Sequence, residues 1–235
     1  MKRLAGVISL LALSSVHAQT PVVSSSDVAD AAERATGRRM HMSEHIRQLS
    51  GTRLFGPAIT MLVVRDDTAS STVEGLKAIQ VIESASAGSV IVVSLEGDPG
   101  FAVFGATFAT LAKSRRLGGF VVDASMRGVS DFRQLGVAMF ARGTVAGSAG
   151  GHYRLNAVNV PVRCGGVEVA PGDLVVGDAD GIAIAPKERY QEVLTRAAEL
   201  RDEKNALLPL ITKHRSYTAA VEQRKAAQQK NKSRQ

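Results

Sequence analysis

Ser89-Val-Ile-Val-Val-Ser94 and Gly119-Phe-Val-Val-Asp123 are two short apolar runs separated by a helical stretch from Phe104 to Arg116. Both runs are rich in β-branched residues and bounded by glycine, which is typical of strands buried on both faces. Between them, one side of the expected helix carries apolar residues, namely Phe104, Phe108, Leu111 and Ala112. Strand, helix and strand in this order predict a βαβ unit with parallel strands.

The sequence upstream of this unit adds two helices and a strand. A helix capped by Ser26 or Asp27 is expected to end at Gly37, because hydroxyl and carboxylate side chains cap helix starts and glycine favours helix ends. The apolar residues of 54–64 predict a strand, and those of 72–84 recur with a helical period.

The sequence changes character after residue 136. Short apolar runs alternate with glycine-containing turns up to Pro186, which indicates several short strands. A helix is expected from about Glu188 to Leu207. Residues 213–235 are rich in Lys, Arg, Gln and Ala and are expected to form a frayed helix or a disordered tail. We therefore expect one α/β domain at 27–212, followed by a basic tail.

The basic character of the chain comes from its ends. The 235 residues carry a formal net charge of +7. Residues 213–235 hold seven Lys or Arg against one Glu, and Lys2 and Arg3 add two more, so the part between is close to neutral. No nucleic-acid partner is therefore expected for the domain. The single cysteine, Cys164, excludes an intrachain disulfide and a Cys-based zinc cage.

The first 18 residues have the pattern of an export signal. A cationic start at residues 2–3 precedes an apolar run at 4–13, which is too short to span a membrane. Val16 and Ala18 are small residues at the −3 and −1 positions of a signal-peptidase site. We expect a signal peptide cleaved after Ala18, a linker at 19–26, and a periplasmic or secreted protein without a membrane span.

An anion site is expected at the carboxyl ends of the two parallel strands, where α/β sheets bind ligands. Gly105 opens a helix there, and the unpaired N–H groups of a helix start attract carboxylates. Arg127 follows the second strand and could hold an oxoacid through two parallel hydrogen bonds. A small anionic substrate is one interpretation, and an ion pair between Arg127 and Asp131 is the other.

Four blocks of sequence resemble the motifs of one known family. They are Gly56-Pro-Ala-Ile-Thr60, Ala102-Val-Phe-Gly105, Gly119-Phe-Val-Val-Asp123 with Arg127, and Pro161-Val-Arg-Cys-Gly-Gly-Val-Glu-Val-Ala-Pro-Gly-Asp173, which continues to Pro186. Over roughly 25–208 the chain resembles the family of 4-hydroxy-4-methyl-2-oxoglutarate aldolases, oxaloacetate decarboxylases and the regulator of ribonuclease E activity. The resemblance implies a compact β/β/α domain of swivelling-domain topology, assembled as trimers or pairs of trimers with active sites between subunits.

The activity that this resemblance implies is carbon–carbon cleavage of a 2-oxo acid to release pyruvate. The charge left on the pyruvate enolate must be stabilised by a Schiff-base lysine or a divalent cation, and the family uses Mg²⁺ or Mn²⁺. By resemblance, Arg127 is the catalytic residue. The pyruvate moiety would bind to its side chain and to the backbone of Gly105, Ala106, Thr107 and Phe108.

The sequence departs from the family pattern at the metal site. Active aldolases carry a metal-ligating Asp directly after the arginine, where this chain has Gly128, and an acidic residue commonly follows the helix-opening glycine, where it has Ala106. The remaining candidate ligands are Asp131 and Glu203, the latter reaching the site of a neighbouring subunit. Glu199 is an alternative to Glu203.

Three functions are therefore compatible with the sequence. The first is an exported, metal-assisted lyase acting on oxaloacetate or a related 2-oxo acid. The second is a non-catalytic member that binds such an acid without turnover, as the loss of the ligand at Gly128 suggests. The third is a protein-interaction role like that of the ribonuclease regulator, against which an exported location argues.

Overall fold

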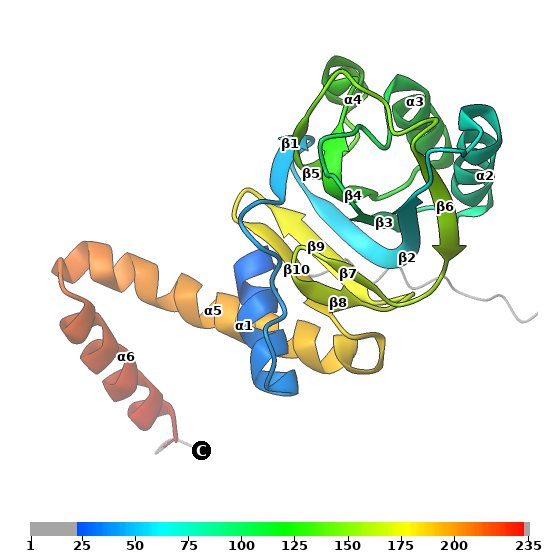
Figure 1. The fold of residues 1–235 in the computed structure, drawn as a ribbon. Coiled ribbons are helices and arrows are strands. Elements are labelled where there is room, and N and C mark those ends of the chain that lie inside the picture. The colour runs from blue at the N-terminus through cyan, green and yellow to red at the C-terminus, as the bar shows by residue number, and fades with distance from the viewer. Residues whose placement is uncertain (1–22, 233–235) are drawn as a thin grey trace, which may run out of the picture.

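The strands form one eight-stranded mixed sheet and a separate two-stranded ribbon in this computed structural model, which describes residues 23–232 (Figure 1). The sheet contains β1 (Arg47–Ser50), β2 (Leu54–Arg65), β3 (Val90–Glu96), β4 (Gly119–Met126), β5 (Met139–Thr144), β6 (Tyr153–Val158), β9 (Leu174–Asp178) and β10 (Gly181–Ala185). Their order is β1-β5-β4-β3-β2-β9-β10, with β6 also paired to β2. The ribbon consists of β7 (Val162–Cys164) and β8 (Val167–Val169).

The helices cover both faces of the sheet. They are α1 (Ser25–Thr36), α2 (Ser71–Ser84), α3 (Ala106–Arg115), α4 (Val129–Leu135), α5 (Tyr190–His214) and α6 (Tyr217–Lys232), with a short 3₁₀ helix, η1 (Lys187–Arg189), before α5. Figure 1 shows α2, α3 and α4 gathered on one side and α1 with α5 on the other. The expected α/β class is thus confirmed.

The βαβ unit is confirmed with the expected parallel pairing. In β3 and β4, Val90 lies opposite Gly119 and Val92 opposite Val121. Side chains of neighbouring residues point to opposite faces of the sheet. Val90, Val92 and Val121 therefore pack in one core layer, and Ile91, Val93 and Phe120 in the other. This double burial explains why both runs are continuously apolar rather than alternating.

The start of α3 differs slightly from the expectation. The helix was expected from Phe104, but it begins at Ala106, with Gly105 as the N-cap in an extended conformation. Phe104 instead packs in the core beside the rings of Phe108 and Phe120, at centroid distances of 4.5 and 5.3 Å. The chain therefore enters the helix through Gly105, directly above a buried aromatic cluster.

The expected cap at Ser26 or Asp27 is wrong by two or three residues. The N-cap of α1 is Ser24, whose hydroxyl accepts from the backbone N–H of Asp27, while the Asp27 carboxylate accepts from that of Ser24. Because Val23 and Ser25 are buried, the last residues of the expected linker belong to the domain. The expected signal peptide at 1–18 lies outside the described residues.

The C-terminal helices extend further than the sequence predicted. The helix expected at 188–207 continues to His214, where Arg215 adopts a left-handed turn. The described part of the expected tail is ordered as α6, in which Ala220 is buried and Arg224 donates to the carbonyl oxygen of Glu203. Packing of small side chains against α5 therefore orders a segment whose composition alone indicated a frayed helix or disorder.

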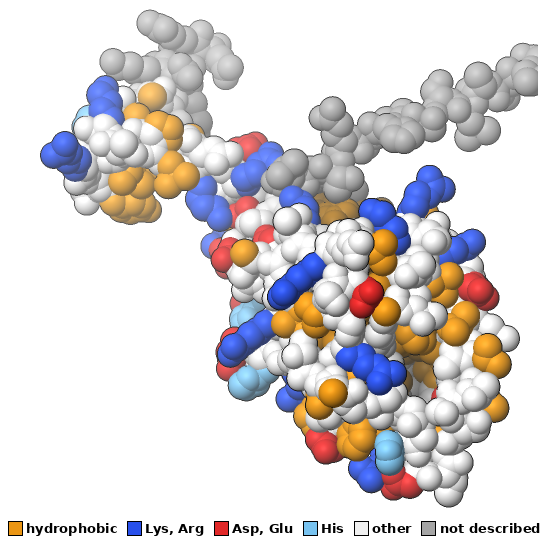
Figure 2. All heavy atoms as spheres, turned by 90° about the horizontal axis from the view of Figure 1, so that it is seen from above, with side chains coloured by type: hydrophobic (Ala, Val, Ile, Leu, Met, Phe, Trp, Pro, Cys, Tyr) orange, Lys and Arg blue, Asp and Glu red, His pale blue; other side chains and the backbone are white. Residues whose placement is uncertain are grey.

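The surface agrees with the charge distribution of the sequence. Figure 2 shows Lys and Arg side chains scattered over the visible face of the domain among acidic and apolar ones, without a continuous basic patch. Across residues 23–232, no helix combines the length and the apolar character that a membrane span requires.

Candidate functional site

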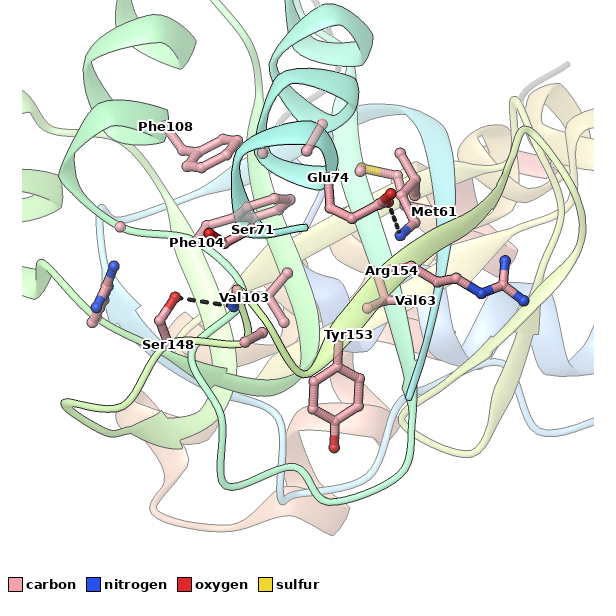
Figure 3. A pocket seen from close by; sticks show the side chains of 17 residues that line it. Met61, Val63, Ser71, Glu74, Val103, Phe104, Phe108, Ser148, Tyr153 and Arg154 are labelled. Atoms are coloured by element: carbon pink, nitrogen blue, oxygen red, sulfur yellow. Dashed lines mark hydrogen bonds between the residues drawn. The ribbon is translucent and has the colours of Figure 1, made fainter. Parts of the chain in front are cut away.

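A pocket of about 430 Å³ lies beyond the carboxyl ends of β3 and β4 (Figure 3). Its walls come from β2, the first turns of α2, the loop and helix start at 103–108, Arg127, and the segment 148–155. Parallel strands β2, β3 and β4 end at the same edge of the sheet, which brings these segments together.

The start of α3 leaves several backbone donors free. Gly105 caps the helix without a side-chain hydrogen bond. The N–H groups of Phe108 and Ala109 both donate to the Gly105 carbonyl oxygen. The N–H groups of the N-cap Gly105 and of Ala106 and Thr107, in the first turn, have no acceptor within residues 23–232. Of the four backbone positions named from the resemblance, Phe108 has its N–H bonded to Gly105, whereas the N-cap Gly105 and the helix residues Ala106 and Thr107 have an N–H free to bind an anion.

Arg127 lies directly against this helix start. Its backbone N–H donates to the carbonyl oxygen of Phe104, and its Nη1 donates to that of Ala146 at 3.4 Å. A Cβ atom at Gly105 would lie 3.3 Å from Cγ of Arg127. The absence of a side chain at Gly105 therefore lets the arginine cross in front of the helix.

The sequence left an ion pair between Arg127 and Asp131 as the alternative to an anion site. Among the ion pairs of the described residues, none joins Arg127 to Asp131. The exposed guanidinium keeps most of its five N–H donors available to a ligand. The positive charge of Arg127 and the two free N–H groups of α3 thus lie at the same end of the pocket.

Gly128 has a conformation that opposes any side chain. It adopts a left-handed conformation, with φ 68°, as the N-cap of α4. A Cβ atom there would lie 2.8 Å from the backbone nitrogen of Ala106 and 3.3 Å from Oδ2 of Asp131. The local backbone has therefore closed around the glycine, and an aspartate at this position would be both strained and crowded.

The candidate metal ligands are not brought together within one chain. No group of three or more His, Cys, Asp or Glu side chains in the described part of the chain is arranged to hold a metal ion. Asp131 approaches Gly128, whereas Glu203 is exposed on α5. The first turns of α5 pack in the core layer opposite to that of α3. Within one described chain, Asp131 and Glu203 therefore do not form a cation site together.

The far end of the pocket was not anticipated from the sequence. Glu74 of α2 accepts hydrogen bonds from Nζ of Lys77 and from the backbone N–H of Leu155, both at 2.7 Å. Figure 3 shows Glu74 beside Met61, away from Phe108 and Ser148. Glu74 and Leu155 are 81 residues apart and meet because β6 pairs with β2, a long-range contact that no local motif signals.

Comparison with known proteins gives consistent results. A family model described as RraA-like, Aldolase/RraA, matches residues 25–184. A curated protein of Halalkalibacterium halodurans, named putative 4-hydroxy-4-methyl-2-oxoglutarate aldolase, is 37% identical over 145 residues, which is 62% of this chain and 65% of that protein. This chain therefore spans slightly less than two thirds of that relative.

Two solved structures are similar over most of the chain. An uncharacterized protein from Pseudomonas syringae pv. tomato has a TM-score of 0.77 and 25% identity, covering 86% of this chain and 90% of that one. Streptomyces coelicolor RraAS2 is described as an unusual member of the RNase ES inhibitor RraA protein family. It has a TM-score of 0.67 and 29% identity, covering 78% of this chain and 90% of that one. The α/β fold observed here is thus the fold of these proteins.

Proposed function

The chain belongs to the RraA-like family of aldolases and RraA proteins, and on this basis we propose that it binds a small 2-oxo acid between the start of α3 and Arg127. One observation carries the proposal: Arg127 crosses directly in front of the helix start that leaves the N–H groups of Ala106 and Thr107 free. A guanidinium and helix-terminal N–H groups together form a strong site for a carboxylate.

The orientation of the acid follows from these donors. The carboxylate would lie on the guanidinium of Arg127, which presents two parallel N–H groups. The adjacent oxo group, which lies in the same plane, would accept from the backbone N–H groups of Ala106 or Thr107. Neither residue 106 nor residue 128 carries a carboxylate that would repel the ligand.

Carbon–carbon cleavage is the second candidate function, favoured by the relative named as a putative 4-hydroxy-4-methyl-2-oxoglutarate aldolase. Such cleavage requires stabilisation of the enolate of pyruvate. The residues of one described chain do not form a cation site, and we assign no step to a metal. In a homo-oligomer, proposed here as a trimer or a pair of trimers, Glu203 of a neighbouring subunit would be the residue to test.

Export is proposed separately, from the signal pattern at residues 1–18. A periplasmic or secreted protein would begin at Gln19 after cleavage. The mass of the protein recovered from its native host tests this directly. A mass matching 19–235 is expected, and an intact Met1 would refute export and favour an intracellular interaction role.

Binding of pyruvate, measured by isothermal titration calorimetry, tests the proposed function. The Arg127→Gln variant should lose at least about tenfold in affinity, because a hydrogen bond to a charged group contributes ~1.5–3 kcal/mol. Arg133→Gln is the matched control, since this exposed arginine lies on α4 outside the pocket. Equal affinities of native protein and Arg127→Gln would refute the proposed site.

Turnover is measured with the same proteins. Pyruvate release from oxaloacetate is followed with Mn²⁺ and with a chelator, against metal alone as background. We expect no release above that background. Release that depends on both metal and protein would show that the oligomer supplies ligands absent from one chain, and would establish the lyase function.

A further inference from the structure

We propose that this pocket selects a monoanionic 2-oxo acid whose chain continues through an apolar segment to a neutral hydrogen-bond donor, such as a hydroxyl group, that contacts Glu74. The inference rests on the proposed binding of the 2-oxo acid at Arg127. It concerns the opposite end of the same pocket, which determines which acid is preferred.

The pocket is larger than a three-carbon acid requires. Its volume of about 430 Å³ lies within the range of ~300–1,000 Å³ usual for sites that enclose much larger organic ligands. Pyruvate held at Arg127 would leave most of this space to water. The preferred ligand therefore extends from the helix start towards α2.

The middle of the pocket is apolar. The side chains between the two ends come from β2, α2 and the loops after β3 and β5, namely Met61, Val63, Ala78, Val103, Phe104 and Ala149. All but Val103 are buried. Burial of methylene groups against such a surface stabilises a complex by ~0.8 kcal/mol for each CH₂. A ligand with an aliphatic segment is thus favoured over one that carries a charge close to the oxo group.

Glu74 gives the far end its polarity. Its side chain is only 13% exposed, and each carboxylate oxygen already accepts one hydrogen bond, from Lys77 or from Leu155. An ionised carboxylate has about four acceptor positions and no donor. Two acceptor positions therefore remain, which a donor on the ligand can satisfy in place of water.

The ionisation of Glu74 supports an acceptor role. Burial raises the pKa of its carboxyl, but hydrogen bonds from Lys77 and from the backbone of Leu155 outweigh burial and hold the pKa below its ordinary value. The group therefore stays charged at neutral pH. Because Lys77 already pairs with this charge, the matching ligand group is a neutral donor rather than a second cation.

A dicarboxylic acid fits this end poorly. Its distal carboxylate would face the partly buried Glu74, and like charges at close range disfavour binding. Of the two nearby cations, Lys77 is already paired with Glu74, and Arg154 is engaged with Asp66 and with Oδ1 of Asn156. In Figure 3 the guanidinium of Arg154 points away from the pocket.

Three five-carbon acids that differ only at the distal end test the inference. These are 2-oxopentanoate, 5-hydroxy-2-oxopentanoate and 2-oxoglutarate, with pyruvate as reference, each titrated calorimetrically into the native full-length protein at pH 7. The hydroxy acid should bind most tightly, and 2-oxoglutarate at least about tenfold more weakly than the hydroxy acid, which corresponds to ~1.4 kcal/mol.

Glu74→Gln should reduce the discrimination against 2-oxoglutarate to less than about threefold, since the amide removes the charge and keeps an acceptor for Leu155. Glu83→Gln, on the exposed part of the same helix, is the matched control and should leave the ranking unchanged. Native protein that binds pyruvate but prefers 2-oxoglutarate would overturn this inference alone. Native protein that binds neither pyruvate nor any of the three acids would overturn the proposed function with it. The order of affinities of the native protein for these acids tests the inference even if a variant fails to fold.

Discussion

Gly128→Ala is the substitution for which the structure gives the sharpest expectation. The residue lies at φ 68°, and its missing Cβ would approach the backbone nitrogen of Ala106 to 2.8 Å and Oδ2 of Asp131 to 3.3 Å. The first contact is with backbone at the start of α3 and cannot be relieved by rotating a side chain. The substitution should therefore affect both the stability of the protein and the anion site.

The size of the effect has two parts. A left-handed conformation costs an alanine ~1–2 kcal/mol relative to glycine. Inserting a methyl group where the packing leaves no room costs ~1–3 kcal/mol. We therefore expect Gly128→Ala to lower the free energy of unfolding by about 2–5 kcal/mol.

Gly136→Ala separates these two contributions. Gly136 ends the same helix at φ 66°, but a Cβ atom there would meet nothing within 4 Å. This variant should lose only the conformational part, ~1–2 kcal/mol. The difference between the two variants therefore measures the crowding against Ala106.

Urea unfolding followed by far-ultraviolet circular dichroism measures both values, and equal slopes against denaturant show that the same transition is compared. The affinity for pyruvate should also fall in Gly128→Ala and stay unchanged in Gly136→Ala, because only the first displaces a donor of the site. Equal stability losses in the two variants would refute the argument that the backbone has closed around Gly128.

Three further expectations follow from local contacts. Gly105→Ala should leave the stability nearly unchanged, because an extended backbone accepts alanine. It should weaken pyruvate binding severalfold, because the added methyl group would lie 3.3 Å from Cγ of Arg127. An unchanged affinity in calorimetry would contradict this expectation. Burial raises the pKa of Asp27, but the ion pair with Lys204 and the bonds from Ser24 leave it below 3.8. The ionised carboxylate therefore stabilises the fold above pH 3.8. In urea unfolding, Asp27→Asn should have a lower free energy of unfolding than the native protein, and this difference should shrink as the pH falls through the lowered pKa. A difference that does not change with pH would refute the contribution of the ionised Asp27. Complete burial raises the pKa of the Cys164 thiol, so a disulfide reagent should label it only upon unfolding, and rapid labelling of native protein would show that the site opens.

The sequence predicted the parts of the fold that are encoded locally. The apolar runs of β3 and β4 are continuous because both faces are buried, and glycine marks the start of α3. The helix start at Ser24 was missed because several hydroxyl and carboxylate side chains follow one another there, and the reciprocal hydrogen bonds of Ser24 with Asp27 select among them.

The candidate site was predictable only where its residues are close in sequence to the strands. Arg127 follows β4 directly, so its place at the edge of the sheet could be inferred. Glu74 meets the segment around Leu155 through the pairing of β2 with β6, which no pattern in either segment specifies. The left-handed conformation of Gly128 was equally hidden, because glycine is compatible with every region of backbone space.

Ala106 and Gly128, the two positions where the resemblance led us to expect acidic residues, are neighbours in space. The backbone nitrogen of Ala106 is the atom that a side chain at position 128 would strike. Acidic residues at both positions would surround a cation, but without one they would repel a carboxylate from the same helix start. With both absent, Asp131 is the carboxylate that remains beside Gly128, and the proposed ligand would meet the N–H groups of α3 and the charge of Arg127. Neutral residues at both positions therefore favour the proposed direct binding of an anion, and we expect that an aspartate introduced at position 128 alone would clash with the backbone of Ala106.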